Sequence, residues 1–381
     1  MKEHALLEML KAKKSNCTGC GCCENVCSQD AITMCKDTLG FLRPAVHEER
    51  CIDCMRCVKA CPAMSNRKGI GCEEPECLAV CAEDDLRVKS SSGGVFSCLA
   101  DEVFNRGGLV FGVAMGEDMT AYHCCAETPD ELWKIRKSKY VQSRTGLIYR
   151  SVKEGLSRGK LVLFTGTPCQ VAALEAYLGE HPENLITADI LCHGVPSGKM
   201  LRDYLAESQT ETVESIDFRP SEQGWKRSPQ ILKVTNPDGS SRFYGKSQSA
   251  YEQGFHANLI LQGSCFNCKF AEIPRRADIS MGDFWGIGDK DKSFDDDLGT
   301  SVVLLNTQRG FEFFEEAQRN RKKRCKVRRA PVEWLEFNRI HAEESENPSR
   351  KYFEYLYPRV GFTQAVKDAM AYKAPIGIVG P

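Results

Sequence analysis

The sequence predicts a small, cysteine-rich α+β domain, followed by a larger α/β domain with a mixed sheet and a helical C-terminal tail. Three observations predict this order. Eight cysteines repeat one spacing within residues 17–61. Strand-like and helix-like segments then alternate, which is typical of α/β domains. The final segment, residues 336–381, has the pattern of helices around a polar break at Asn347-Pro-Ser.

The eight regularly spaced cysteines form two runs of the pattern C-x2-C-x2-C-x3-C. The runs span residues 17–27 and 51–61, and Pro62 follows the second. This spacing is typical of two-cluster bacterial ferredoxins, in which the fourth cysteine of each run binds the other cluster. The sequence therefore predicts two [4Fe-4S] clusters. The predicted ligands of the first are Cys17, Cys20, Cys23 and Cys61, and those of the second are Cys27, Cys51, Cys54 and Cys57.

Other uses of these cysteines fit the spacing less well. A disulfide framework is not expected to repeat one spacing twice, and a third cysteine in each run is surplus to a zinc site built from C-x2-C pairs. Cys22 lies inside the first run but out of phase, so we interpret it as a spectator. Residues 30–34 and 40–44 predict two short strands. These segments complete a predicted ferredoxin domain of residues 1–68.

Composition limits the classes of function. The chain has 381 residues, of which 42% are hydrophobic and 27% charged, as in globular proteins of more than one domain. A net charge of −1 argues against general nucleic-acid binding. The 21 cysteines fall mostly in metal-like spacings, which predicts a cytoplasmic, reducing location. No apolar run approaches the ~20 residues of a membrane span, so none is expected.

Hydrophobic periodicity and turn residues predict the elements of the larger domain in order. A polar linker with glycine and proline precedes it at residues 65–75. The predicted strands are 77–82, 109–114, 121–126, 161–165, 185–191, 277–281 and 301–306. The predicted helices are 94–106, 146–156, 170–178, 199–208, 250–262 and 310–318. Residues 216–244 are β-rich, with a hairpin signal at Asn236-Pro-Asp-Gly.

Four further cysteines are placed for a third metal site. Cys169 and Cys192 each follow the carboxyl end of a predicted strand, where sites form in parallel α/β sheets. Cys265 and Cys268 form a C-x2-C pair. Four thiolates can hold a third [4Fe-4S] cluster, which we favour because the ferredoxin domain already implies electron transfer. A four-thiolate zinc site, or a C-x2-C pair with two unrelated core cysteines, stays open.

Two glycine-containing turns are candidates for binding a dinucleotide such as FAD. Small residues before a helix leave backbone N–H groups open to phosphate, although such residues are also ordinary helix caps. A lysine and a tyrosine elsewhere can contact a flavin, or can end a solvated strand. The candidate residues are Ser92, Gly93 and Gly94, then Lys139 and Tyr140, then Thr165, Gly166 and Thr167.

Three other features fit either a functional or a structural role. Asp278 and Asp283 follow the C-x2-C pair, where they can line a redox pocket, or Asp278 can act as a cap or pair with Arg276. His193 can donate a hydrogen bond or a proton near the third site, or can be structural. The basic run 319–329 predicts a solvated face, with docking of an acidic electron carrier as the functional reading.

Taken together and in order, five motifs make residues 77–345 resemble the family of beta subunits of coenzyme F420 hydrogenases and dehydrogenases. The motifs are Ser91-Ser-Gly-Gly-Val-Phe-Ser, Ser138-Lys-Tyr-Val, Thr165-Gly-Thr-Pro-Cys-Gln, Cys265-x2-Cys268 and Ala277-Asp-Ile-Ser-Met-Gly-Asp. The resemblance implies an N-terminal part at 73–155, a C-terminal part at 156–335 and a helical tail at 336–381. It also matches the four later cysteines, the first of them Cys169, to positions where the family carries cluster ligands.

The resemblance implies an FAD-containing iron–sulfur flavoprotein oxidoreductase. Its [4Fe-4S] clusters and FAD would pass electrons to or from a two-electron carrier or small-molecule substrate, either coenzyme F420-like or another. A redox partner protein or ferredoxin is the expected protein partner. The segment Cys192-His-Gly-Val-Pro-Ser looks like a bacterial branch rather than the hydrogenase partner itself. The alternative is a non-catalytic electron-transfer subunit of a larger redox complex, and the sequence identifies no catalytic residue.

Overall fold

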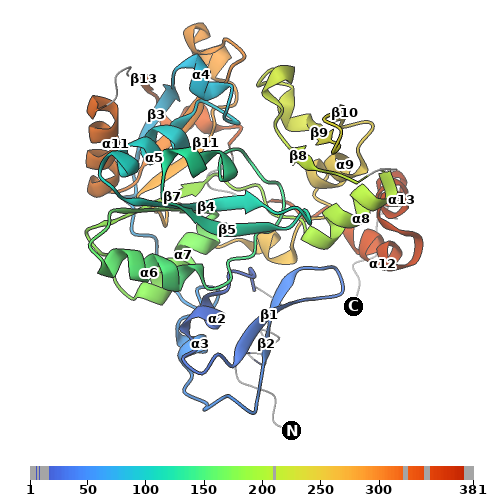
Figure 1. The fold of residues 1–381 in the computed structure, drawn as a ribbon. Coiled ribbons are helices and arrows are strands. Elements are labelled where there is room, and N and C mark those ends of the chain that lie inside the picture. The colour runs from blue at the N-terminus through green and yellow to red at the C-terminus, as the bar shows by residue number, and fades with distance from the viewer. Residues whose placement is uncertain are drawn as a thin grey trace.

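A small N-terminal domain projects from a larger body in the computed structural model of this protein (Figure 1). The structure describes Leu6, Glu8 and residues 17–208, 212–320, 325–338 and 344–372. Leu6 and Glu8 are helical. The rest of the helix predicted at residues 1–14 lies outside the described residues.

The small domain is built from two short helices and an antiparallel strand pair. Helix α2 (Cys22–Val26) precedes strands β1 (Ile32–Lys36) and β2 (Leu42–Val46), and helix α3 (Arg56–Lys59) follows them. Both strands begin two residues later than predicted, after turns at Asp30 and Gly40 that have positive φ angles. The ferredoxin-like domain thus has the predicted α+β composition.

An eight-stranded mixed sheet forms the centre of the larger body. Its strand order is β13-β3-β12-β11-β7-β6-β4-β5. The four strands from β11 to β4 are parallel, and the strands on both sides of them are antiparallel. The strands are β3 (Glu76–Cys81), β4 (Leu109–Met115), β5 (Ala121–Ala126), β6 (Val162–Gly166), β7 (Leu185–Ile190), β11 (Ile279–Asp283), β12 (Ser301–Leu305) and β13 (Lys326–Arg329).

Helices cover both faces of this sheet (Figure 1). Helices α5 (Val95–Asn105) and α11 (Gln308–Asn320) pack on one face, where Val110 and Leu163 point. Helices α6 (Ile148–Ser157) and α7 (Pro168–Leu178) pack on the other, against Phe111 and Phe164. Successive side chains of a strand point to opposite faces, so both faces of each central strand are apolar. The predicted mixed α/β sheet is confirmed.

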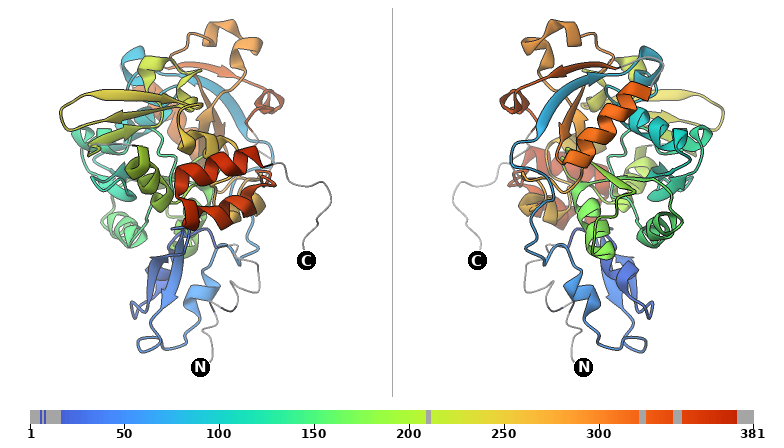
Figure 2. Two further views of the ribbon diagram at one scale, coloured as in Figure 1. Left: turned by 90° about the vertical axis from the view of Figure 1, so that its right-hand side faces the viewer. Right: turned by 90° about the vertical axis from the view of Figure 1, so that its left-hand side faces the viewer.

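A second layer of helices and a small sheet lie beside the large sheet (Figure 2). Strands β8 (Ser215–Asp217), β9 (Ile231–Thr235) and β10 (Ser241–Gly245) are antiparallel, and β9 and β10 form the predicted hairpin. They share a core with α8 (Gly198–Ser208), α9 (Ala250–His256), α12 (Arg350–Val360) and α13 (Phe362–Ala371). The last two are the predicted C-terminal helices.

Further predicted elements differ in the structure. Helix α9 ends at His256 instead of residue 262, because Asn258 has a left-handed backbone with φ 57°. Strand β11 begins at Ile279, two residues late. Within the basic run 319–329, predicted as a solvated face, residues 321–324 lie outside the described residues, and residues 326–329 form the edge strand β13, whose side chains are all exposed. The short helices α4 (Asp84–Arg87) and α10 (Ile287–Lys290) were not predicted.

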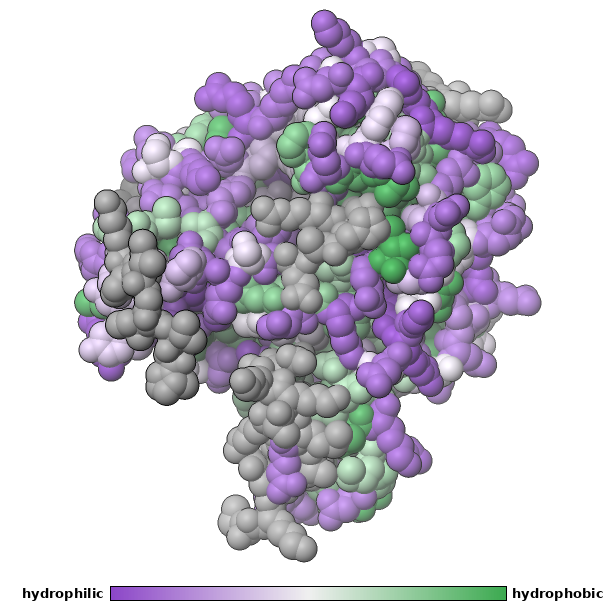
Figure 3. All heavy atoms as spheres, turned by 180° about the vertical axis from the view of Figure 1, so that it is seen from behind, coloured by the Kyte–Doolittle hydropathy of each residue, from purple (hydrophilic) through white to green (hydrophobic). Residues whose placement is uncertain are grey.

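The surface is largely polar. The face seen in Figure 3 carries mostly hydrophilic side chains, with apolar ones scattered between them. None of the helices that the structure describes combines the length and the apolar character that a bilayer crossing requires.

Candidate metal centres

The cysteines predicted to bind the first cluster lie together in the small domain. Burial raises the pKa of the Cys20 thiol, and the nearby thiols of Cys61 and Cys17 raise it further. Burial also raises the pKa of Cys23, again with contributions from Cys20, Cys17 and Cys61. Two thiolates close together repel, so such mutual effects mark neighbouring sulfur atoms. The fourth cysteine of the second run therefore joins three cysteines of the first.

The second predicted ligand set gathers around Cys57. Burial is the largest cause that raises the pKa of its thiol to about 11. Nearby thiols also raise this pKa, and they are those of Cys27, Cys51 and Cys54. The structure thus brings together the two interleaved sets that the spacing predicts. Their use as cluster ligands stays a prediction.

The two cysteine runs share a local backbone conformation. In each run, the residues before and after the second cysteine are left-handed. In the first run these are Gly19 and Gly21, with φ 69° and 71°. In the second they are Asp53 and Met55, with φ 50° and 60°. Non-glycine residues rarely adopt this conformation, so the sequence repeat is also a structural repeat.

The four later cysteines also converge. Cys169 lies in the first turn of α7, directly after strand β6, and Cys192 follows the neighbouring parallel strand β7. Burial, and then Cys268 and Cys192, raise the pKa of Cys169 to about 12. Burial likewise raises the pKa of Cys265 to about 12, with contributions from Cys268 and Cys169. The carboxyl ends of β6 and β7 and the C-x2-C segment therefore meet at one place.

Four thiols at one place suit a thiolate-bound metal group, which would displace their protons on binding. Within the part of the chain that the structure describes, no set of three or more histidine, cysteine, aspartate or glutamate side chains is arranged for a single metal ion. The third cluster stays a prediction, and so does its zinc alternative.

The first and third cysteine groups are neighbours. The Cys169 thiol is one of the groups that raise the pKa of Cys20. Cys22, the out-of-phase cysteine, is 1% exposed and donates its thiol hydrogen to the Ala60 carbonyl at 3.3 Å. Its pKa is raised by burial first and then by thiols of both ferredoxin groups, Cys20 and Cys57 among them. It therefore lies between those two groups rather than within either.

Side chains of the larger domain hold the backbone of the first cysteine loop. Tyr149 donates its hydroxyl to the Cys20 carbonyl at 2.8 Å, and Gln262 donates to the Cys17 carbonyl at 2.8 Å. Gln142 accepts from the Leu42 amide at 2.9 Å. These hydrogen bonds join the small domain to the larger domain, which also carries the third cysteine group.

The predicted flavin residues of the first turn have structural partners. Ser92 donates to the Thr300 carbonyl at 3.1 Å. A Cβ atom on Gly93 would lie 2.2 Å from the Val80 carbonyl oxygen, so a glycine is required for packing there. Gly94 precedes α5 with φ 82°. Close packing thus explains these residues without a phosphate, and it leaves the flavin role a prediction.

The other predicted flavin residues are likewise engaged. Burial lowers the pKa of Lys139 to about 8, while its ammonium group donates to three backbone carbonyls, the Arg136 carbonyl among them. The Tyr140 ring stacks on Phe255 with centroids 4.9 Å apart. Thr165 donates to the Phe111 carbonyl at 2.8 Å. Gly166 follows it at the end of β6.

Thr167 connects the second turn to the third cysteine group. Its hydroxyl lies 3.1 Å from the Cys169 sulfur, and it forms a capping box with Gln170 at the start of α7. The segments of the first turn and of Lys139 also meet, because the Ser138 amide donates to the Ser91 hydroxyl at 2.9 Å. The turns are therefore held by the fold in defined positions.

The structure gives Asp278, Asp283 and His193 structural partners. Asp278 accepts hydrogen bonds from the Thr187 amide and hydroxyl and from the Thr307 hydroxyl, at 2.7–2.9 Å. The alternative pairing with Arg276 is wrong, because that guanidinium donates to backbone carbonyls of residues 67 and 68.

His193 lies 3.0 Å from a Glu344 carboxylate oxygen. Asp283 pairs with Arg219 at 2.6 Å. Arg219 was not singled out from the sequence, although it is only 1% exposed and also donates to the Tyr140 hydroxyl. Arg219 and Asp283 are 64 residues apart, so no local sequence pattern could predict that this arginine is buried against that carboxylate.

The fold and the cysteine groups define a chain with a ferredoxin-like domain joined to a mixed-sheet α/β domain that carries further clustered thiols. Comparison with known sequences agrees. A 4Fe-4S dicluster domain model matches residues 16–65. Models of the coenzyme F420 hydrogenase/dehydrogenase beta subunit match residues 77–147 for its N-terminal part and 159–328 for its C-terminal part. The chain therefore belongs to the family of coenzyme F420 hydrogenase/dehydrogenase beta subunits, with an N-terminal 4Fe-4S dicluster domain.

Individual relatives are distant. One subunit of the F(420)H(2) dehydrogenase of Methanosarcina mazei is 24% identical over 170 residues, which are 41% of this chain and 47% of the relative. The match thus spans about half the length of that protein. A chain of the F420-reducing [NiFe] hydrogenase complex from Methanosarcina barkeri aligns with a TM-score of 0.48 and 18% identity, over 81% of this chain and 91% of that one.

Proposed function

We propose that this protein is an iron–sulfur flavoprotein oxidoreductase. It passes electrons between three [4Fe-4S] clusters, FAD and a two-electron carrier or small-molecule substrate, either coenzyme F420-like or another. One observation carries the proposal, namely that the third cysteine group lies beside the first, with Cys169 close enough to raise the pKa of Cys20. A relay needs such adjacent sites, whereas a purely structural metal does not.

The cysteine groups define an order for electron transfer. The third group, in the larger domain, neighbours the first, and the first shares Cys22 as a neighbour with the second. Bound FAD would exchange an electron pair with the substrate and single electrons with the clusters. The chain's own residues hold the thiols, exclude water and fix the loops. The hydrogen bonds to the Cys20 and Cys17 carbonyls serve this last purpose.

The flavin is proposed for the region near the turns around Gly93 and Thr167. Family membership supports this, together with the contact between Thr167 and Cys169, which would put a ligand at this turn close to the third cluster. The substrate is left as either a coenzyme F420-like carrier or another small molecule, because the segment Cys192-His-Gly-Val-Pro-Ser resembles a bacterial branch of the family. A cytoplasmic location and a redox protein partner belong to the same proposal.

A second candidate is a non-catalytic electron-transfer subunit of a larger redox complex. The ferredoxin-like domain favours it, because this domain projects from the larger body (Figure 1). Stoichiometric flavin with turnover of a small molecule would support the enzyme. Flavin that turns over only after a partner is added would support the electron-transfer role.

The test is the iron, sulfide, zinc and flavin content of anaerobically purified protein, with absorption spectra before and after reduction. We expect about twelve irons per chain, at four per cubane, and one FAD. About eight irons with zinc would replace the third cluster by a structural zinc site. A chain that holds no flavin and cannot be reconstituted with any would refute the flavoprotein proposal.

A further inference from the structure

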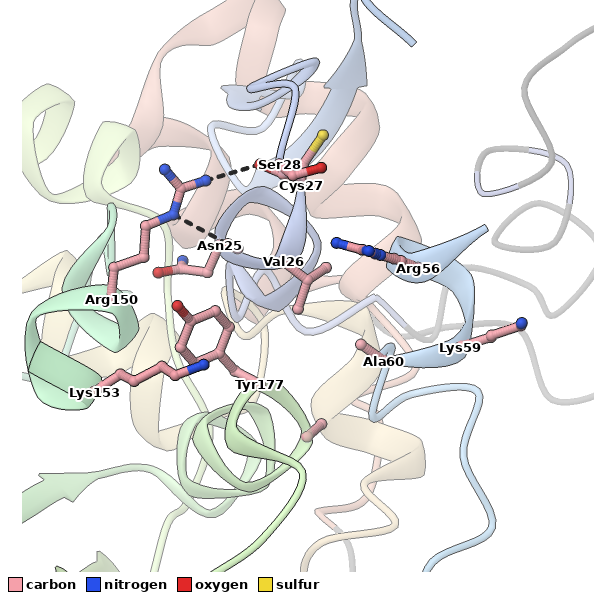
Figure 4. Close-up of a pocket in the computed structure, with 11 residues that line it drawn as sticks. Asn25, Val26, Cys27, Ser28, Arg56, Lys59, Ala60, Arg150, Lys153 and Tyr177 are labelled. Carbon is pink, nitrogen blue, oxygen red and sulfur yellow. Dashed lines mark hydrogen bonds between the residues drawn. The ribbon is translucent and has the colours of Figure 1, made fainter. Parts of the chain in front are cut away.

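A basic pocket lies at the junction of the small domain and the larger body. It has a volume of about 540 Å³ and is lined by residues of α2, α3, α6 and α7 and of the segment after α2. In the close-up, Arg56 and Lys59 lie on one side of it and Arg150 and Lys153 on the other, with Tyr177 between them (Figure 4). The pocket is therefore shared by both domains.

The charged side chains that line this pocket are all positive. Its lining contains four cationic side chains, and no carboxylate is found among the described residues that form it. The whole chain, by contrast, has 51 basic and 52 acidic residues. Arg56, Lys59 and Lys153 are exposed, and none of them pairs with a carboxylate in the described ranges. Three cations thus remain available for an anionic partner.

The fourth cation has a different task. Arg150 donates to the carbonyls of Asn25 and Cys27, at 3.1 and 2.9 Å, and to the Asp30 carboxylate at 2.8 Å. It is committed to holding the end of α2 (Figure 4). Its contacts with residues 25, 27 and 30 position the residues of α2 that line the pocket, and they form without any bound ligand.

The pocket is adjacent to a predicted cluster. Cys27 lines it, and Cys27 belongs to the thiol group around Cys57. Arg56 and Lys59 flank Cys57 on the short helix α3. A partner bound in this pocket would therefore lie directly beside the second cluster site.

We propose that this basic pocket docks an acidic one-electron carrier protein. The inference rests on the proposed function, because it requires a cluster held by Cys27, Cys51, Cys54 and Cys57. One electron passes from the reduced carrier to that cluster, so the carrier is oxidised and the cluster reduced by one electron each. No bond forms and no proton moves. The reverse transfer uses the same surface.

The arrangement of the cations favours a protein over a small anion. A site for a small anion gathers its donors at one buried point. Here the three available cations are exposed, and they lie on opposite sides of the basic pocket, on α3 and α6 (Figure 4). Separated, exposed charges attract and orient a complementary protein surface.

The test compares charge reversals at the pocket with one elsewhere. Lys59→Glu, Lys153→Glu and the double variant are prepared beside Lys367→Glu, which changes an exposed lysine on α13 by the same charge. The probe is a purified, strongly acidic two-cluster [4Fe-4S] ferredoxin, and its Kd is measured anaerobically. Each pocket variant should bind about fivefold more weakly at ~50 mM salt. The difference should shrink at ~500 mM salt, because salt screens exposed charges.

A second readout does not depend on electron transfer. Carbodiimide cross-linking of the wild-type protein to the ferredoxin should join Lys59 or Lys153 to the partner's carboxylates, as located by mass spectrometry. Pocket variants that bind as tightly as Lys367→Glu, or cross-links elsewhere, would overturn the proposal. Loss of wild-type binding in ~1 mM inorganic phosphate would indicate a small-anion site instead.

Iron and flavin content separates this inference from the function on which it rests. Lys153 lies outside the small domain, so Lys153→Glu should keep the iron of the wild type and still bind more weakly. If the wild type holds twelve irons and flavin but the pocket variants bind normally, only the docking inference fails. If flavin and the third cluster are missing, the proposed function fails, whatever the binding result.

Discussion

At the residue scale, single side chains fix the positions of the cysteines and of the sheet. Asp278 accepts three hydrogen bonds that join β7, β11 and the segment before α11. Arg219 is enclosed with Asp283 and Tyr140. Glu175, on α7, differs from these residues because its carboxyl group is incompletely hydrogen-bonded. Its Oε1 atom is buried without a hydrogen-bond partner, and burial raises its pKa to about 7.

Glu175→Gln should stabilise the protein at alkaline pH. Because the folded-state pKa lies above the ordinary 4.5, the cost of ionising this carboxyl is absent at low pH and grows as pH rises toward 7. Removing it should add roughly 3 kcal/mol at pH 8 and under about 1 kcal/mol at pH 5. Anaerobic thermal unfolding at both pH values measures the difference. Glu180→Gln, an exposed control, should change neither midpoint, and a loss of stability at pH 8 would contradict the assignment.

At the element scale, short helices and turns set the geometry of each centre. Helix α7 begins with the capping box of Thr167 and Gln170, which places Cys169 in its first turn. Helix α2 begins after the left-handed Gly21 and ends against Arg150. Most predicted elements are present, since each carries its own periodicity. The end of α9 was predicted wrongly, because a backbone turn at Asn258 overrides local composition. The sequence did not predict strand β13, which forms by edge pairing with β3.

Arg150→Lys should loosen the end of α2. A lysine has one ammonium group, which cannot reach the two carbonyls and the carboxylate that the guanidinium binds. Amide hydrogen exchange at residues 25–31 should accelerate about fivefold, which corresponds to about 1 kcal/mol. Arg158→Lys is the control, because Arg158 directly follows the same helix and forms an exposed ion pair with Glu154. Unchanged exchange in the Arg150 variant would show that other contacts hold this segment.

At the scale of the whole molecule, three thiol groups follow one another from the sheet to the small domain. The third group lies at the carboxyl ends of β6 and β7, and the first lies against it. Cys22 lies between the first group and the second group. The body positions the small domain through Tyr149, Gln142 and Gln262, so the order of the groups depends on the docking of the two domains.

Cys268→Ser should interrupt electron transfer between the proposed flavin and the two ferredoxin clusters. Iron should fall from about twelve to about eight per chain, because one cubane loses a ligand while the ferredoxin pair stays intact. Dithionite should still reduce the two remaining clusters. A two-electron donor that acts through the proposed flavin should no longer reduce them. Cys72→Ser, at an exposed cysteine outside the three groups, should keep all the iron. Twelve irons in the Cys268 variant would exclude this residue as a ligand.

The sequence by itself predicted the grouping of the ferredoxin cysteines, the mixed α/β composition and the family. Cysteines three residues apart are placed by the local backbone, as the repeated left-handed positions around Cys20 and Cys54 show. Strand and helix periods are equally local. The tertiary structure alone decided that Cys20 meets Cys169, that Arg219 is buried with Asp283, and that Arg150 supports Cys27. These partners lie between 64 and 149 residues apart, as 283 minus 219 and 169 minus 20 give, so only chain packing can bring them together.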